Sequence, residues 1–128
     1  MRMSFITLLV LALIVLSGTA TYAWDGYAAA GVSAPGEAED HSGTITNPGW
    51  SYYVLTTLTV SMIGNGEAHA EVTGTETKSY TIYSTSEPVT VHPTVQTGTG
   101  SARADVYVDL YYGGEVAGAS AGFNWGGK

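Results

Sequence analysis

The stretch that decides the fold lies at residues 102–112 and reads Ala-Arg-Ala-Asp-Val-Tyr-Val-Asp-Leu-Tyr-Tyr. Small or apolar side chains alternate in it with polar or aromatic ones. The two alternating series are Ala102, Ala104, Val106, Val108 and Leu110, and Arg103, Asp105, Tyr107, Asp109 and Tyr111. Successive side chains of a β-strand point to opposite faces of the sheet, so this alternation predicts a strand with one buried face.

An internal repeat extends this pattern toward the N-terminus. The stretch Gly-Asn-Gly-Glu-Ala-His-Ala-Glu-Val at residues 64–72 matches Gly-Thr-Gly-Ser-Ala-Arg-Ala-Asp-Val at residues 98–106, at a spacing of 34 residues. Both copies place a glycine-rich turn before the pattern Ala-x-Ala-acid-Val. Two copies are too few for a solenoid, so they indicate a sheet built from related hairpins.

The same alternation predicts the other strands of a mainly β domain. Expected strands are residues 51–63, 67–77, 79–83, 89–97 and 115–125. Gly64-Asn65-Gly66 and Gly113-Gly114 are typical of tight hairpin turns, because they supply positive φ angles. Pro93 cannot donate to a sheet ladder and therefore predicts an edge strand or a bulge. Six to eight short strands with glycine-rich turns predict a small antiparallel β-sandwich of immunoglobulin-like shape.

The domain is expected to begin near residue 35. Residues 33–48 are polar and rich in turn residues, and they end in Asn47-Pro48-Gly49. We interpret them as a connection with one short strand around residues 44–46. The expected organisation is therefore an N-terminal segment at 1–34 and a sandwich domain at 35–128.

The N-terminal segment carries no charge between Arg2 and Asp25. Its 22 residues would span roughly 33 Å as a helix, about the thickness of a bilayer core. One interpretation is a signal peptide over residues 1–23, with small residues for cleavage after Ala20 or Ala23. The other is a retained helix from about residue 3 to residue 33, followed by the end signal Pro35. The sequence leaves both open, and both place the sandwich outside the cytoplasm.

The retained helix resembles a known family. Residues 8–16 read Leu-Leu-Val-Leu-Ala-Leu-Ile-Val-Leu and precede Tyr22-Ala23-Trp24 and Gly26; this layout is similar to the N-terminal helix of archaeal type IV pilins. The resemblance implies that helices bundle in a filament core and that β-domains form its surface. Residues expected to pack in that core are Leu9, Leu11, Leu13, Ile14 and Leu16, with Gly18, Ala20 and Ala23 allowing close approach of backbones. The implied partners are copies of the same chain, with the membrane as the location before assembly.

Composition excludes several classes of function. The formal net charge is −7, and only four residues of 128 are Lys or Arg. Nucleic-acid binding therefore has no electrostatic footprint in this chain. The absence of cysteine excludes thiol catalysis, thiolate zinc sites and iron–sulfur clusters. A small extracellular domain without disulfides relies on packing, a metal or self-association, which mildly favours oligomers.

Three polar patterns in the sequence are candidate sites of chemistry. Glu67-x-His69-x-Glu71 places three polar groups on one strand face, but they are too far apart to share a metal without further ligands. Residues 37–41, Glu-Ala-Glu-Asp-His, are interpreted as an acidic linker rather than a calcium loop. Residues 118–122, Gly-Ala-Ser-Ala-Gly, match the nucleophile-elbow pattern, but no acid or His follows them. We therefore expect no catalytic residues, no bound metal and no cofactor.

Exposed aromatic residues suggest a second class of function. Trp50 and Trp125 are the sugar-stacking candidates, because indole rings pack well on sugar rings; the alternative for such residues is core packing or subunit contact. The preferred hypothesis is a non-enzymatic structural subunit of an extracellular, pilus-like filament at the cell surface. The alternative is a secreted monomeric β-sandwich that binds surface glycans or mediates adhesion after the signal peptide is removed.

Overall fold

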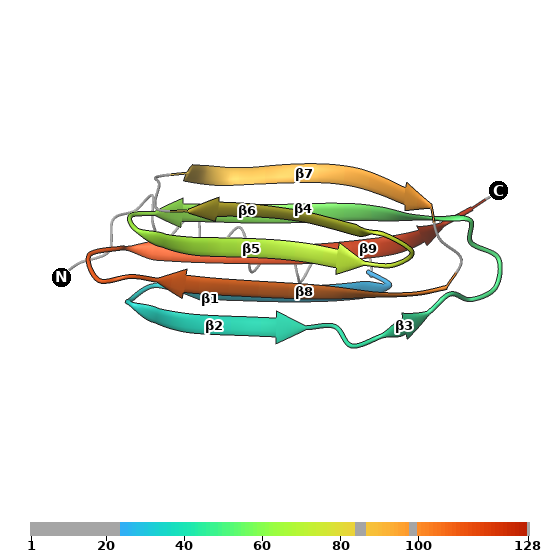
Figure 1. Cartoon of the computed structure of the whole chain (residues 1–128), viewed down its shortest axis with the longest axis horizontal. Helices are drawn as coiled ribbons and strands as arrows, with labels where there is room; N and C mark the ends of the chain where they lie inside the picture. Colours follow the sequence, from blue (N-terminus) through green and yellow to red (C-terminus); the bar gives the residue numbers. More distant parts are fainter. Residues whose placement is uncertain (1–23, 84–86, 98–99, 128) are drawn as a thin grey trace.

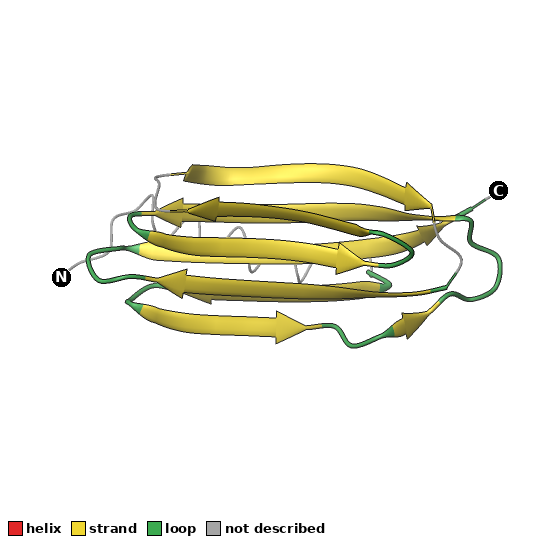
Figure 2. Ribbon diagram, viewed as in Figure 1, coloured by secondary structure: helices red, strands yellow, loops and turns green. Residues whose placement is uncertain are grey.

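The chain forms a two-layered β-sandwich (Figure 1). The computed structural model describes residues 24–83, 87–97 and 100–127, and it describes residues 87–97 by their backbone alone. Within these residues every element is a strand or a loop (Figure 2). The described part of the chain therefore holds no helix able to cross a membrane.

The described residues form nine strands, which make up two antiparallel sheets. Their bounds are β1 Gly26–Val32, β2 Gly36–His41, β3 Ile45–Thr46, β4 Tyr53–Ile63, β5 Gly66–Thr73, β6 Thr77–Tyr83, β7 Glu87–Thr97, β8 Ser101–Leu110 and β9 Val116–Gly126. Sheet A has the strand order β1-β9-β4-β7. Sheet B has the order β2-β8-β5-β6, with β3 also paired to β8. The β-sandwich prediction is confirmed at this level.

The internal repeat becomes two neighbouring antiparallel strands of sheet B. In the register of β5 and β8, alanine lies opposite valine at each of three inward positions: Ala68 with Val108, Ala70 with Val106, and Val72 with Ala104. Each small residue therefore leaves room for the larger one beside it. All six side chains are buried, which keeps the core close-packed without long side chains.

The core lies between the sheets and is mostly aliphatic. Its largest fully buried side chains are Phe123, Leu58, Met62, Leu110, Val54, Val60, Val72, Val106 and Val108. The inward positions of β9 begin with three alanines, at residues 117, 119 and 121, and continue with Phe123 and Trp125. The phenyl and indole rings of those last two residues meet edge to face at 5.6 Å, an arrangement that aromatic pairs prefer.

The two predicted hairpins are sheet-to-sheet connections instead. Gly64 and Asn65 link β4 of sheet A to β5 of sheet B, and residues 111–115 link β8 of sheet B to β9 of sheet A. Gly64 has a φ of 106°, and a Cβ there would lie 2.6 Å from Cα of Gly114. Glycine is therefore needed at these positions, as expected, but the reason is that the β4–β5 and β8–β9 connections approach each other closely. Among the described pairings, only β5 with β6 joins consecutive strands.

The predicted helix does not extend over its last ten residues. Residues 26–32 form strand β1, which pairs with β9 along its whole length, from Gly26 opposite Phe123 to Val32 opposite Ala117. Tertiary pairing overrides the helix propensity of Ala28, Ala29 and Ala30. The sandwich therefore begins at β1 rather than at residue 35, and residues 1–23 lie outside the described residues.

The predicted linker at residues 33–48 is also largely sheet. Gly36–His41 form β2, and the expected short strand is present as β3. The acidic run resembles a linker in sequence because β2 is an edge strand whose polar residues face solvent. Pro93 was interpreted correctly, since β7 is an edge strand of sheet A.

A matched pair of leucine variants on β4 tests this arrangement. Leu58 points into the core and is 1% exposed, whereas Leu55 points outward and is 44% exposed. We expect Leu58→Ala to lower the free energy of unfolding by about 2–5 kcal/mol. Leu55→Ala should change it by about 0.5 kcal/mol or less. Urea unfolding followed by circular dichroism measures both, and equal losses would contradict the assigned faces of β4.

Candidate functional site

The outward side chains of sheet B gather most of the protein's negative charge. We call this surface the acidic face. It comprises Glu37, Glu39 and His41 of β2; Arg103, Asp105, Tyr107 and Asp109 of β8; Glu67, His69, Glu71 and Thr73 of β5; and Ser79, Thr81 and Tyr83 of β6. Six of the eleven acidic residues of the chain lie on it. The strand register arranges its side chains in rows that cross the sheet.

One row brings three carboxylates side by side. Asp109 of β8 lies opposite Glu37 on one neighbouring strand and opposite Glu67 on the other. Adjacent strands are about 4.8 Å apart, and like charges directly opposite each other destabilise a sheet. The described part of this row contains no basic residue. Its carboxylates are therefore acceptors that gain from a hydrogen-bond donor supplied from outside.

A second row is balanced by basic groups. The His41 Nδ1 atom lies 2.6 Å from Asp105 Oδ1, and Arg103 Nε lies 3.0 Å from Asp105 Oδ2. The hydrogen bond to Asp105, reinforced by the charges of Asp105 and Glu39, raises the pKa of His41 above its ordinary value. Asp105 thus holds two basic side chains in place on β2 and β8.

The predicted Glu67-x-His69-x-Glu71 pattern does lie on one outward face. His69 Nε2 lies 3.0 Å from Glu71 Oε1, and its Nδ1 lies 2.5 Å from the Thr81 hydroxyl. Both ring nitrogens therefore have protein partners. No group of His, Asp and Glu in residues 24–83 and 100–127 has the arrangement to hold a metal ion, and the site is described without one.

Tyr107 occupies the centre of the acidic face. It lies between His69 and Glu39 in the register, and its hydroxyl donates to Asp109 Oδ2 at 3.4 Å. Partial burial, together with the charges of Asp109 and Glu37, raises the pKa of Tyr107 to about 12. The phenol therefore stays protonated and remains a donor. Its ring lines a hollow of about 280 Å³ with Glu37, Ala38 and Glu39.

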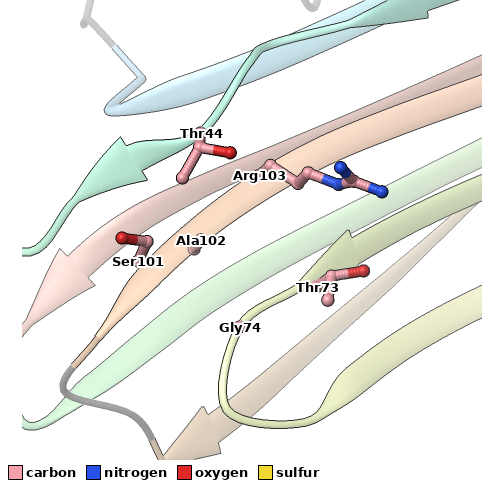
Figure 3. Close-up of a pocket in the computed structure, with 6 residues that line it drawn as sticks. All are labelled: Thr44, Thr73, Gly74, Ser101, Ala102 and Arg103. Carbon is pink, nitrogen blue, oxygen red and sulfur yellow. The ribbon is translucent and has the colours of Figure 1, made fainter.

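A second hollow lies further along β8 (Figure 3). It measures about 220 Å³ and lies between β3, β8 and the β5–β6 turn. Its lining residues are Thr44, Thr73, Gly74, Ser101, Ala102 and Arg103. Hydroxyl groups and one guanidinium therefore line this hollow, and carboxylates and a phenol line the first.

The sugar-stacking candidates have different fates. Trp50 lies in the loop before β4 and is 50% exposed, so its ring is accessible. Trp125 is 8% exposed and belongs to the core. The prediction for Trp125 is wrong, because the odd-numbered side chains of β9 point inward. The two rings do not form a shared stacking surface.

Two other groups of residues singled out in the sequence are the assembly residues and the elbow-like pattern. The assembly residues Leu9, Leu11, Leu13, Ile14, Leu16, Gly18, Ala20 and Ala23 lie outside the described residues. Ser120 of the elbow-like pattern lies within β9 and is buried, so no exposed strand-to-helix turn presents it. The small residues around Ser120 allow close packing, which fits a strand of small residues and not a nucleophile elbow.

Sequence reasoning missed Tyr107 and Arg103 as site residues. Both residues lie on β8, whose alternation is the clearest in the sequence, and the repeat predicts acidic residues on the outward face of β8. The sequence does not predict that β2 pairs with β8, and this pairing adds Glu37, Glu39 and His41 to the same surface.

Comparison with known proteins gives only distant likenesses. No family model matches the chain, and no curated protein matches it. The carbohydrate-binding module TmCBM61, solved in complex with β-1,4-galactotriose, superposes with a TM-score of 0.48 and 11% identity over 78% of this chain and 70% of that chain. The enzymatically active domain of bacteriophage CBA120 tailspike protein 4 gives 0.45 and 16% identity over 73% of this chain. A ruminal GH26 endo-β-1,4-mannanase gives 0.36 and 15% over 71% of this chain. This chain covers only 15% and 18% of the latter two proteins.

The pairing of His41 with Asp105 predicts a pH dependence. Because the folded-state pKa of His41 is raised, its contribution to stability is fully present below the ordinary pKa of about 6.5 and is lost as the pH rises through the raised value. NMR titration of the imidazole should show Asp105→Asn lowering this pKa, and Glu39→Gln lowering it less. An unchanged pKa in Asp105→Asn would contradict the assigned contact.

Proposed function

We propose that this protein is a non-catalytic binding module that acts outside the cell and holds a glycan without acidic groups along β8 on the acidic face. The observation that carries the proposal is the pair of hollows on either side of Asp105, both opening on this face. Strand β8 contributes Tyr107 to one hollow and Arg103 to the other.

The chemistry of the face favours a ligand rich in hydrogen-bond donors. Carboxylates accept hydrogen bonds and donate none, and the row Glu67, Asp109 and Glu37 has few protein donors beside it. Covering a carboxylate without giving it a donor costs free energy, so a ligand must bring its own donors. The hydroxyl groups of a sugar meet this requirement without carrying charge.

The shape of the face favours an elongated ligand. From Tyr107 to Ser101 the strand advances six residues, which corresponds to about 20 Å. A chain of several sugar units laid along β8 would reach both hollows. The Tyr107 ring would stack on one unit, and Arg103 and Thr44 would donate to hydroxyl oxygens of another.

The charge of the protein restricts the class of glycan. With a net charge of −7 and six carboxylates on the face, uronic acids and sulfated sugars are repelled. The face is also open to water, with the His41 and Glu39 side chains more than half exposed. A general acid needs a pKa raised by burial, so an open face suits binding better than hydrolysis.

A second candidate function is the filament subunit expected from the N-terminal segment. In sheet A, the outward side chains of β1, β4 and β9 that the structure describes carry no charge, whereas the acidic face carries six carboxylates. Such an asymmetry suits a subunit that buries one face in an assembly and leaves the other in solvent. The two functions are compatible, because they use opposite faces.

Glycan binding is tested with neutral and acidic polysaccharides. Affinity gel electrophoresis of the protein in amylose, galactan, mannan and mixed-linkage glucan should show retardation by at least one of them, and none in alginate or polygalacturonate. Tyr107→Ala should weaken the retained interaction about tenfold or more, which corresponds to about 1.4 kcal/mol. Tyr107→Phe should weaken it less, because the ring remains.

Two controls make this test specific. Tyr52 is exposed but lies before β4, away from the acidic face, so Tyr52→Ala should bind as the parent does. If Trp50→Ala abolishes binding while Tyr107→Ala does not, the ligand site lies at the loop end and the proposal is wrong. Binding that disappears in high salt would indicate a cationic partner instead of a glycan.

The filament hypothesis predicts retention of the hydrophobic segment and assembly. Intact mass of material from the producing cells should include residues 3–23, and negative-stain electron microscopy should show filaments. Replacing Leu13 with Asp should abolish filaments, because a charge would be buried between helices. A mature chain that starts near Trp24 and sediments as a monomer would contradict this second candidate.

A further inference from the structure

The outer face of sheet A differs in kind from the acidic face. Its described outward side chains are Tyr27, Ala29 and Gly31 of β1; Val116, Gly118, Ser120, Gly122 and Asn124 of β9; and Tyr53, Leu55, Thr57, Thr59, Ser61 and Ile63 of β4. None of them is charged. A solvated sheet face normally carries charged and polar residues opposite its core side, so this surface lacks the composition of a freely exposed one.

Several of these outward side chains are buried although they point away from the core. Thr59, Ser61 and Ser120 are 3%, 0% and 2% exposed, and Val116 is 0% exposed while lying outside the core cluster. The Ser61 hydroxyl has no hydrogen-bond partner within the part of the chain that the structure describes. Toward the other end of β4, Leu55 is exposed. The burial is thus confined to one part of the face, as expected for a surface that something covers.

The chain enters the sandwich on this same face. The Trp24 ring lies over Gly122, where a Cβ would come within 2.7 Å of the indole, and it stacks on Tyr27 at 5.8 Å. Tyr27 in turn forms a hydrogen bond with Ser120. Asp25 fixes the entry point, because its Oδ2 accepts from the Trp125 backbone N–H at 2.8 Å.

We propose that the outer face of sheet A is the docking surface for residues 3–23 of the same chain. The segment is uncharged, as the face is, and it is joined to Trp24 directly. From Gly122 back to Val116 the face extends about 20 Å, which a helix covers with about 13 residues. The small outward residues of β9, Gly118, Ser120 and Gly122, let a helix approach closely. This docking goes beyond glycan binding, which uses the opposite face.

The test uses paired cysteines, since the native chain has none. Gly118, opposite Ser61, lies four residues from Gly122 along β9, or about 13 Å. About nine helical residues cover that distance, which places residues near 15 over Ser61. Ser61→Cys is therefore combined in turn with Leu13→Cys, Ile14→Cys, Val15→Cys and Leu16→Cys, which sample one helical turn. The full-length chain, verified by intact mass, is oxidised and analysed by non-reducing electrophoresis and peptide mapping.

We expect at least one pair to form an intramolecular disulfide in most of the chains. The matched control is Ser79→Cys, an exposed outward position on the opposite face, and it should form none with the same four partners. Disulfide-linked dimers would overturn the proposal by showing a second copy on the face. The absence of any link with Ser61→Cys, or a mature chain lacking residues 3–23, would also overturn it.

The outcome is separable from glycan binding. Affinity for the retained polysaccharide is measured on the four variants that carry Ser61→Cys, and it should match that of the parent chain whether or not the disulfide forms. Loss of cross-linking with intact glycan binding refutes only the docking, and loss of glycan binding in Tyr107→Ala says nothing about it.

Discussion

The fold depends on the close approach of two sheets whose inward side chains are small. Sheet B sets alanine opposite valine along β5 and β8, and β9 of sheet A presents three alanines before Phe123 and Trp125. These small side chains fit together closely, and dispersion contacts between them stabilise the core in a chain that has no cysteine for disulfides. Glycine at the connections is part of the same constraint, because Gly64 and Gly114 meet where the chain crosses between layers.

Once the sheets have closed on this core, their outer faces divide the chemistry of the chain. The acidic face presents rows of carboxylates, hydroxyls and the Tyr107 phenol around two hollows. On the opposite face, the outward side chains of β1, β4 and β9 that the structure describes are uncharged, and several of them are buried. Charge segregation of this degree orients a protein relative to any surface that it meets. It is the physical basis for assigning ligand binding to one side and docking to the other.

Period-two alternation predicted the strands well, because it is a local property of the sequence that shows which face of a strand is buried. It did not predict which strands pair. Gly64-Asn65 and Gly113-Gly114 are compatible with a hairpin and with a crossing between sheets, and only the distant partners β8 and β9 decide between them. Ala28, Ala29 and Ala30 favoured a helix locally, yet pairing with β9 makes them strand. The repeat predicts the acidic residues that β5 and β8 contribute to the acidic face. It does not predict those of β2, because residues 36–41 resemble a linker in sequence.

The strand order also has a consequence for how the chain reaches this state. Strands β8 and β9 occupy interior positions in their sheets, yet they are the last two described strands in chain order. Neither sheet can be completed before residues 101–126 are present, so β1 must wait for a partner about 90 residues away. Distant pairing of this kind slows folding, because loop-closure entropy is lost before the contacts form. Until residues 101–126 are present, the strands that β8 and β9 separate in each sheet keep unpaired edges, and such edges can pair with other chains.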